Sequence, residues 1–246
     1  MLTVKELSYS FTDSGVGKKV LENISINVQA GEFVSIIGES GSGKSTLFGL
    51  ISGLLQPEQG EIILNGKLTH HRLGKVGFMP QKDLLLPWRT VLDNITLPIE
   101  ITKDNLEKKR EEIRKWLLKF GLLDYENSYP HELSGGMRQR AAFLRTLMTG
   151  KNLLLLDEPF GALDSFTRRS MHEWLLGIWE DLNKTVLFIT HDLEEAILLS
   201  DRIYVLKRDE KSCIEIKIRL PRPRGSEFIY TQEFLETRKS LERLLQ

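Results

Sequence analysis

The segment at residues 38–45, Gly-Glu-Ser-Gly-Ser-Gly-Lys-Ser, constrains the fold most, because it matches the pattern G-x-x-x-x-G-K-[ST]. It follows the apolar run Phe-Val-Ser-Ile-Ile at residues 33–37, a predicted strand, and it opens a stretch with apolar residues at helical spacing. Between a strand and a helix, such a loop directs backbone N–H groups and the positive end of the helix dipole at a phosphate. The sequence therefore predicts an α/β protein with a phosphate-binding loop.

The residue types in this loop divide the expected chemistry among them. Lys44 is expected to meet the β- and γ-phosphates of a nucleotide, Ser45 to offer its hydroxyl to Mg²⁺, and Thr46 to help hold the α-phosphate. A chance glycine-rich turn would not explain the lysine, the hydroxyl and the flanking elements together. The predicted nucleotide-binding residues are Gly38, Glu39, Ser40, Gly41, Ser42, Gly43, Lys44, Ser45 and Thr46.

Two adjacent carboxylates follow a second apolar run, Leu-Leu-Leu-Leu at residues 153–156. As the carboxyl end of a parallel strand, this position lies at the same sheet edge as the phosphate loop. We expect Asp157 to organise Mg²⁺, largely through water, and Glu158 to act as general base toward a water in line with the γ-phosphate. The alternative is a helix N-cap acid, which accounts for one carboxylate but hardly for both.

Hydrophobic patterning predicts an α/β P-loop NTPase core with a mainly parallel sheet, an N-terminal antiparallel β subdomain and an inserted helical subdomain. Turn-forming residues predict a hairpin loop at residues 12–19. A helix is expected over residues 104–120, with Leu106, Ile113, Leu117 and Phe120 on one face and Gly121 as its stop. We divide the single domain 1–246 into about 1–88 and 148–220 (core with β subdomain), about 89–147 (helical subdomain) and about 221–246 (C-terminal helical tail).

Composition excludes several classes of protein. Lys plus Arg and Asp plus Glu both total 34, so no basic surplus points to nucleic acid as a partner. No run approaches the roughly 20 apolar residues of a membrane span, and the N-terminus lacks a secretory signal pattern, so a cytoplasmic location is expected. The single cysteine, Cys213, excludes an internal disulfide and is expected to be a half-buried strand residue.

The segment Leu-Ser-Gly-Gly-Met-Arg-Gln-Arg at residues 133–140 resembles the signature loop of ABC (ATP-binding cassette) ATPases. The resemblance implies that Ser134, Gly135 and Gly136 present a hydroxyl and backbone N–H groups to the γ-phosphate bound by a second subunit. A helix from about residue 138 to 147 would add its dipole. The alternative is a flexible Ser-Gly-Gly linker. Met137 stands where the commonest family version has glutamine, so that polar contact is expected to be lost.

Other residues match family elements in chain order. The resemblance implies that Phe11, with Tyr9 as the fallback, stacks on adenine, and that Gln81 touches Mg²⁺ and the attacking water. It likewise implies that Asp164 meets the partner subunit's phosphate site and that His191 contacts the γ-phosphate. The alternatives are a core phenylalanine, a loop glutamine, a helix N-cap and a core histidine, respectively. The other histidines, among them His172, are assigned no chemistry.

One phosphate loop and one signature loop per chain predict that two copies close face to face on ATP and Mg²⁺, as a homodimer. Membrane partners are implied too, with the apolar segment Leu-Leu-Leu-Pro-Trp-Arg at residues 84–89 as a seat for a permease coupling helix, or else as ordinary packing. Within the family, this segment and the tail at residues 220–224 resemble the nitrate, sulfonate and taurine importers, with relatives for thiamine-pyrimidine precursors. The resemblance thus implies an importer ATPase at the cytoplasmic membrane face, served indirectly by a substrate-binding protein. A nucleotide-gated clamp outside transport and an export ATPase are the alternatives.

Overall fold

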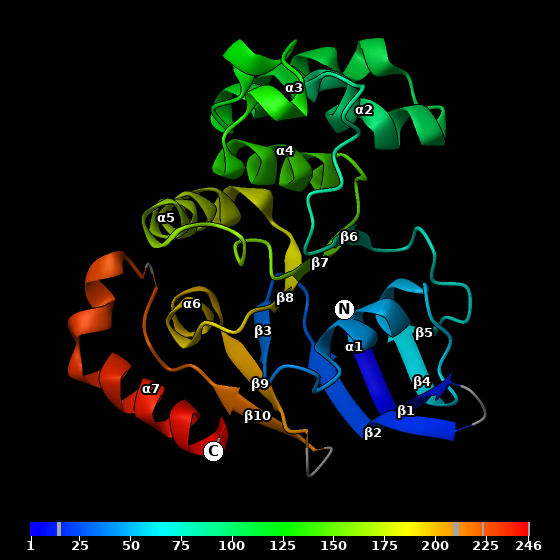
Figure 1. The fold of residues 1–246 in the computed structure, drawn as a ribbon, viewed down its shortest axis with the longest axis vertical. Coiled ribbons are helices and arrows are strands. Elements are labelled where there is room, and N and C mark those ends of the chain that lie inside the picture. The colour runs from blue at the N-terminus through cyan, green and yellow to red at the C-terminus, as the bar shows by residue number, and fades with distance from the viewer. Residues whose placement is uncertain (14–15, 209–211, 223, 246) are drawn as a thin grey trace.

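The computed structural model describes residues 1–13, 16–208, 212–222 and 224–245, and its core consists of two sheets with helices around them (Figure 1). The larger sheet is six-stranded, in the order β10-β9-β3-β8-β7-β6. Its strands are β3 (Phe33–Ile37), β6 (Gly77–Met79), β7 (Leu153–Asp157), β8 (Thr185–Ile189), β9 (Arg202–Leu206) and β10 (Cys213–Lys217). All neighbouring pairs are parallel except β9 and β10. The mainly parallel sheet is therefore confirmed.

Strands β3, β7 and β8 are buried at every position because helices cover both faces of the sheet. Alternate residues of β7 enter different cores. Leu153 and Leu155 join the cluster that contains α1 (Lys44–Ser52), whereas Leu154 and Leu156 join the cluster under α4 (Gly135–Leu147) and α5 (Ser165–Leu182). This burial fixes the carboxyl ends of the strands, where the sequence predicts the functional residues.

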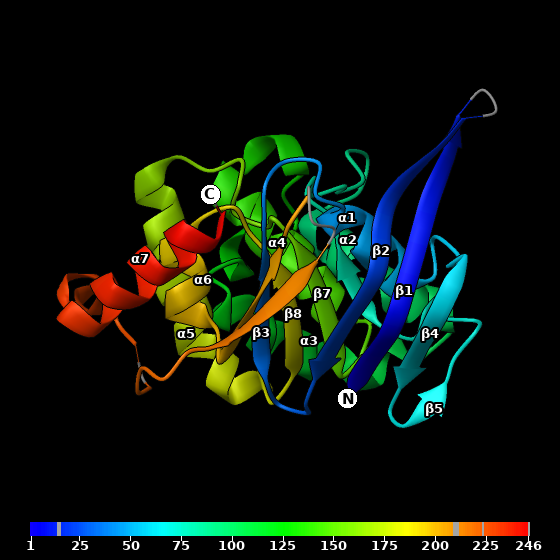
Figure 2. The same cartoon turned by 90° about the horizontal axis from the view of Figure 1, so that it is seen from below.

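The second sheet is antiparallel, in the order β2-β1-β4-β5, with β1 (Leu2–Asp13), β2 (Val16–Val28), β4 (Gln59–Leu64) and β5 (Lys67–Leu68). The predicted hairpin loop at residues 12–19 is wrong, because paired strand continues through most of it, with Phe11 opposite Lys18 and Thr12 opposite Gly17. Cross-strand hydrogen bonding here overrides the turn-forming residue types. Residues 14–15 of the predicted loop lie outside the described residues. Figure 2 shows the β1–β2 hairpin extending beyond the body of the molecule.

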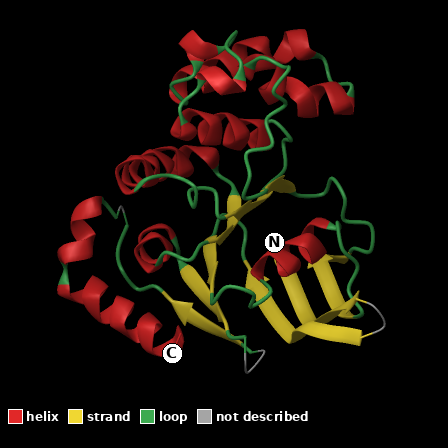
Figure 3. Ribbon diagram, viewed as in Figure 1, coloured by secondary structure: helices red, strands yellow, loops and turns green. Residues whose placement is uncertain are grey.

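The predicted helical subdomain contains α2 (Val91–Thr102), α3 (Leu106–Lys119) and α4 (Gly135–Leu147), which form a separate layer at the top of Figure 3. Ile113, Leu117 and Phe120 are buried as expected, and Gly121 ends α3 with φ +64°. Leu106, predicted on the same face, lines a cavity together with Ile113 but is 40% exposed. It begins the helix about two turns before Ile113, the first residue of α3 that reaches the core.

The remaining helices, α5 (Ser165–Leu182), α6 (Leu193–Leu199) and α7 (Gln232–Leu245), lie on the side of the larger sheet away from α1 (Figure 1). Phe234 and Leu241 of α7 are fully buried against α6 and β9. The guanidinium of Arg224 is buried too, and it donates hydrogen bonds to the carbonyl oxygens of Ile197 and Ser200. The C-terminal segment is thus packed onto the core. None of the helices within the described ranges has the length and apolar character needed to cross a membrane.

Candidate functional site

The loop between β3 and α1 adopts a backbone that requires glycine. Gly41 and Gly43 have φ of +79° and +95°. A Cβ added to Gly38 would lie 2.3 Å from the carbonyl oxygen of Leu206, and one added to Gly43 would lie 2.7 Å from Cδ2 of Leu21. The glycines therefore let the loop turn tightly against β9 and β2 before the helix starts.

Lys44 is buried at the start of α1, with 7% of its surface exposed. Its Nζ donates hydrogen bonds to the carbonyl oxygens of Gly38 and Glu39, each at 2.8 Å. Burial lowers the pKa of Lys44, while the charges of Glu158 and Asp157 raise it. An ammonium group has three N–H donors, so the lysine closes the loop and keeps donor capacity for an anion.

The predicted metal-binding oxygens lie together at the ends of α1 and β7. Ser45 Oγ donates a hydrogen bond to Asp157 Oδ1 at 3.4 Å. Asp157 is buried, and this burial raises the pKa of its carboxyl while the hydrogen bond from Ser45 lowers it. A hydroxyl and a carboxylate oxygen are hard donors of the kind that Mg²⁺ prefers.

The Glu158 carboxylate, at the end of β7, lies beside residues that follow the ends of β6 and β8. Gln81 Nε2, from the segment after β6, donates a hydrogen bond to Glu158 Oε2 at 3.0 Å, and His191 Nδ1, just after β8, lies 3.5 Å from the same oxygen. Glu158 itself has φ +44°, a left-handed conformation that is strained for a residue with a side chain. The hydrogen bond from Glu158 N to Ile189 O holds this backbone conformation, which directs the carboxylate toward Gln81 and His191.

These groups surround a cavity of about 660 Å³. Seven of the nine predicted loop residues line it; Glu39 and Ser42 are not among its described lining residues. Ser42 N donates to Glu39 O at 3.2 Å within the loop, and Ser42 Oγ is buried without a hydrogen-bond partner among the described residues. The lining residues are Phe11, Lys18, Val20, Gly38, Ser40, Gly41, Gly43, Lys44, Ser45, Thr46, Gln81, Glu158 and His191.

Phe11 and Tyr9 both lie on β1, and the sequence alone left the choice between them open. Phe11 is 45% exposed and lines the cavity, which excludes a core role. Tyr9 is half-buried and packs edge-on against Phe11, with ring centroids 5.0 Å apart. Tyr9 therefore supports the Phe11 ring, and Phe11 is the aromatic face offered to the cavity.

The signature-like segment lies elsewhere in the same chain. Ser134 caps α4, its Oγ accepting a hydrogen bond from Met137 N at 3.3 Å, and Gly135 and Gly136 form the first helical turn. The helix thus begins at residue 135, three residues earlier than predicted, because the serine cap allows the glycines to be helical. Figure 1 shows α4 in the helical layer, well away from α1. Neither Ser134 nor the two glycines are among the described residues that line the cavity.

Asp164 occupies the N-cap of α5, the structural alternative of the sequence analysis. Its carboxylate accepts hydrogen bonds from Phe166 N at 3.1 Å and Thr167 N at 3.0 Å. The hydrogen bonds from the Thr167 side chain and backbone, and from the Phe166 backbone, lower the pKa of Asp164. A capping role is therefore present whether or not Asp164 also meets a partner subunit.

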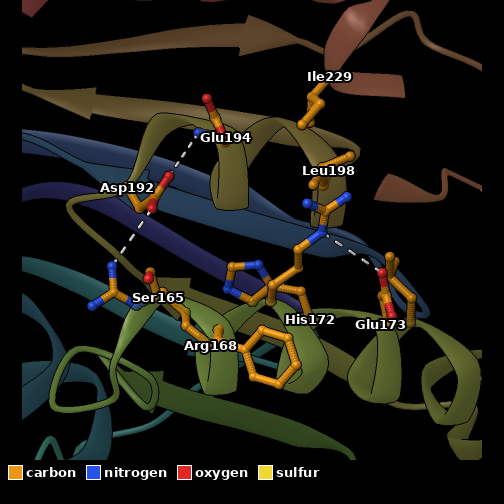
Figure 4. A pocket seen from close by; sticks show the side chains of 11 residues that line it. Ser165, Arg168, His172, Glu173, Asp192, Glu194, Leu198 and Ile229 are labelled. Carbon is orange, nitrogen blue, oxygen red and sulfur yellow. Dashed lines mark hydrogen bonds and ion pairs between the residues drawn. The ribbon is translucent and has the colours of Figure 1, made fainter. Parts of the chain in front are cut away.

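A second cavity, of about 410 Å³, lies between α5 and α6 (Figure 4). Its lining includes Ser165 and Asp192, which directly follow Asp164 and His191 in the chain. Each charged side chain in its lining has an ion-pair partner or a charged contact, and that of Glu194 is Arg238 of α7, outside the lining. Arg168 lies 3.8 Å from Asp192. His172, which was assigned no chemistry from the sequence, lies 2.5 Å from the buried Glu195 beside this cavity. The His172–Glu195 contact joins α5 to α6; residues 23 apart in the chain carry no sequence signal for it.

Comparisons with known proteins agree with this geometry. Residues 21–161 match the family model described as ABC transporter. The chain is 49% identical over 205 residues to the formylaminopyrimidine import ATP-binding protein ThiZ of Halalkalibacterium halodurans, covering 83% of this chain and 79% of that protein. It is 42% identical over 243 residues to the aliphatic sulfonates import ATP-binding protein SsuB of Bacillus cereus, covering 98% and 94%. Its fold is similar to a dimeric, post-hydrolysis structure of the ATP-binding cassette MJ0796 bound to ADP and Pi, with a TM-score of 0.77 and 33% identity over 90% of this chain and 100% of that one.

Proposed function

Since the chain belongs to the ABC transporter ATP-binding family, it is an ATPase subunit that powers the import of a small solute, and we propose that two copies enclose two ATP molecules between them. Each site would combine the cavity of one copy with Ser134, Gly135 and Gly136 of the other. The observation that carries this proposal is the separation of the cavity from α4 within one chain (Figure 1). The dimeric state of the MJ0796 cassette supports it.

In the cavity, Phe11 would stack on adenine, and the loop from Gly38 to Thr46 would hold the phosphates with backbone N–H groups and Lys44. These N–H groups and the Lys44 ammonium are all hydrogen-bond donors. This fit favours an anionic ligand bearing several oxygen atoms.

Glu158 would take the proton of the attacking water. Its Oε2 is fixed by Gln81 and His191, so the general base is oriented before a substrate arrives. His191 would hold its place between this carboxylate and the γ-phosphate. Because Gln81 lies in the segment that connects β6 to the helical subdomain, a movement of that subdomain would change the position of Gln81 relative to the Glu158 carboxylate.

Ser45, Asp157 and Gln81 would hold Mg²⁺, and their oxygen donors fit that ion. When bound, Mg²⁺ neutralises charge on the phosphate oxygens and orients them. The residues themselves supply one hydroxyl, one buried carboxylate and one amide oxygen.

The permease would dock on the segment between Gln81 and α2. Trp88 is 71% exposed and Leu84 is 58% exposed. The segment is nevertheless rigid: the buried Asn94 side chain bonds to Leu86 and Arg89, and Arg145 of α4 donates to Leu84 O at 2.7 Å. An apolar docking surface that is connected to both Gln81 and α4 suits the transmission of movement between the permease and the ATP site.

The location, the partners and the solute class complete the proposal. The subunit would lie at the cytoplasmic membrane face, work with permease subunits and, through them, a substrate-binding protein. The solute would be a small anion or organic nutrient, in keeping with the sulfonate and formylaminopyrimidine importers to which the chain is similar. We further propose to divide the chain into core (about 1–88 and 148–220), helical subdomain (about 89–147) and C-terminal tail (about 221–246), following the positions of α2, α4 and α7.

The test is the solution mass of Glu158→Gln with and without MgATP. Removing the base should lower ATP hydrolysis by about 100-fold or more while leaving binding intact, so an ATP-dependent dimer should accumulate. Glu61→Gln, on the exposed edge of β4, makes the same charge change away from the cavity and should hydrolyse ATP like the wild type. Near-normal hydrolysis by Glu158→Gln would rule out its role as base; a monomer with bound ATP would contradict closure by the two chains alone.

A further inference from the structure

Lys18 of β2 lies directly opposite Phe11 of β1 in the antiparallel hairpin. Residues in such a pair point to the same face of the sheet, with Cβ atoms about 4.5–5.5 Å apart. Both side chains line the nucleotide cavity, and both are exposed. The ammonium of Lys18 is therefore a near neighbour of the proposed adenine platform.

The next inward residue on that face is Val20, which also lines the cavity. Val20 lies at the phosphate loop, since a Cβ added to Gly43 would come 3.0 Å from its Cγ1. Lys18 is two residues from Val20, about 7 Å along the strand. It therefore stands between the aromatic platform and the loop, where the ribose and α-phosphate of a nucleotide bound to both would lie.

The adjacent Lys19 provides an internal comparison. It pairs with Ser10 in the hairpin and points to the opposite face. Its Nζ bonds to Glu22 Oε1, whereas Lys18 makes no ion pair within the described part of the chain. Of these two lysines, only the one that faces the cavity keeps its charge available to a ligand.

Charge in the cavity also favours an anion at Lys18. Lys44, the other lysine in the lining, is buried beside Asp157 and Glu158, whose charges already act on it. A magnesium-bound triphosphate retains net negative charge toward its α-phosphate end. A lysine there would offset that charge without competing for the γ-phosphate.

We propose that Lys18 is a nucleotide-binding residue whose ammonium contacts the α-phosphate of ATP, beside the base stacked on Phe11. This inference rests on the proposed ATP site. It distinguishes Lys18 from Lys44, which acts at the other end of the triphosphate. The contact is the same for ATP and ADP, because both nucleotides carry the α-phosphate.

The experiment compares dissociation constants of ATP, ADP and adenosine for the wild type, Lys18→Ala, Lys18→Arg and Lys19→Ala, at two salt concentrations. Lys18→Ala should weaken ATP and ADP equally, by about fivefold at low salt, the scale of an exposed charge contact, and leave adenosine unchanged. Its salt dependence should be shallower than that of the wild type. Lys18→Arg keeps the charge and should stay within about twofold, and Lys19→Ala should match the wild type.

The outcomes separate this inference from the proposed function. Wild-type affinity in Lys18→Ala, together with normal ATP binding by the wild type, overturns the Lys18 assignment and leaves the ATP site standing. An effect on ATP alone would move the contact to the γ-phosphate, and an equal effect on adenosine would move it to the ribose or the base; either result overturns the proposal. Failure of the wild type to bind ATP would instead refute the proposed function.

Discussion

The chain contains two helix starts suited to phosphate, and they differ in what surrounds them. Helix α1 follows a loop whose N-cap, Gly43, makes no side-chain cap hydrogen bond, and it places Lys44 in a cavity of about 660 Å³. Helix α4 starts at Ser134, whose hydroxyl is occupied by Met137 N, with no acidic side chain in its first turn. The start of α1 and its cavity together form a phosphate-binding site, which we call the α1 half. The start of α4, from Ser134 to Gly136, is an exposed N-cap in the helical layer, and we call it the α4 half or closing half.

Under the proposed function, this difference explains how a single chain would bind a nucleotide and still not act alone. The α1 half carries Lys44, the proposed Mg²⁺ ligands and the proposed base. The α4 half can add a hydroxyl, backbone N–H groups and a helix dipole, which are individually weak but aligned. Affinity would come from the first half, and closure of two chains around the ligand from the second.

The largest effect is expected when one variant chain has a defective α1 half and a second variant chain has a defective α4 half. Lys44→Ala removes the α1 half and Ser134→Arg blocks the closing half, so each variant alone should lose nearly all ATPase activity. Mixed together, they form heterodimers with one intact composite site, and activity should return to at most about a quarter of the wild-type value. Steady-state ATPase assays over a range of mixing ratios measure this.

The control for the mixture is a pair of chains that both carry Lys44→Ala, which has no intact site at any ratio. Far-ultraviolet circular dichroism checks that each variant is folded. An inactive mixture in which ATP-dependent heterodimers are nonetheless detected by mass would contradict the assignment of α4 to the partner's site. Full activity of Ser134→Arg alone would remove the closing half from the comparison altogether.

The sequence predicted the α1 half better than its surroundings. The phosphate loop, Asp157 and Glu158 follow from local patterns, because a strand–loop–helix unit fixes its own geometry. Lys18 could not be found this way, since its place depends on pairing with Phe11 through a hairpin whose strands run further than turn residues suggested. Nor could His172, which gains its partner Glu195 only when α5 packs on α6. Leu106 shows the same limit: helical spacing gives a face but not how far the core extends.

Substitution of Asp164 tests whether a residue outside α4 also contacts the phosphate site of the partner chain. Asp164→Ala removes the N-cap of α5 and should lower the melting temperature by about 2–4 °C, as expected for one cap in a domain of this size. Thr90→Ala removes the matched cap of α2, which accepts a hydrogen bond from Asp93 N at 3.2 Å, away from the cavity. Thermal melts and ATPase assays of both variants separate the roles.

If Asp164 only caps α5, the two variants should lose similar stability and keep similar ATPase activity. A further loss of activity in Asp164→Ala, beyond that of Thr90→Ala at equal stability, would support a contact with the partner's phosphate site. Equal activities would leave Asp164 as a cap alone and confine the closing half to α4.

The smallest effect is expected at Met137, where the family's commonest residue is glutamine. Its backbone N–H, which any residue would supply, makes the bond to Ser134, and its half-buried side chain packs against the core of the helical subdomain. Met137→Gln should therefore change ATPase activity by less than about twofold, within the range of most substitutions outside a core. Ser134→Ala is the matched change of side chain, and it should lower turnover much more than it weakens ATP binding. If Met137→Gln raised turnover by tenfold, the α4 half would need a side-chain contact that this chain lacks, and backbone donors alone would not explain closure.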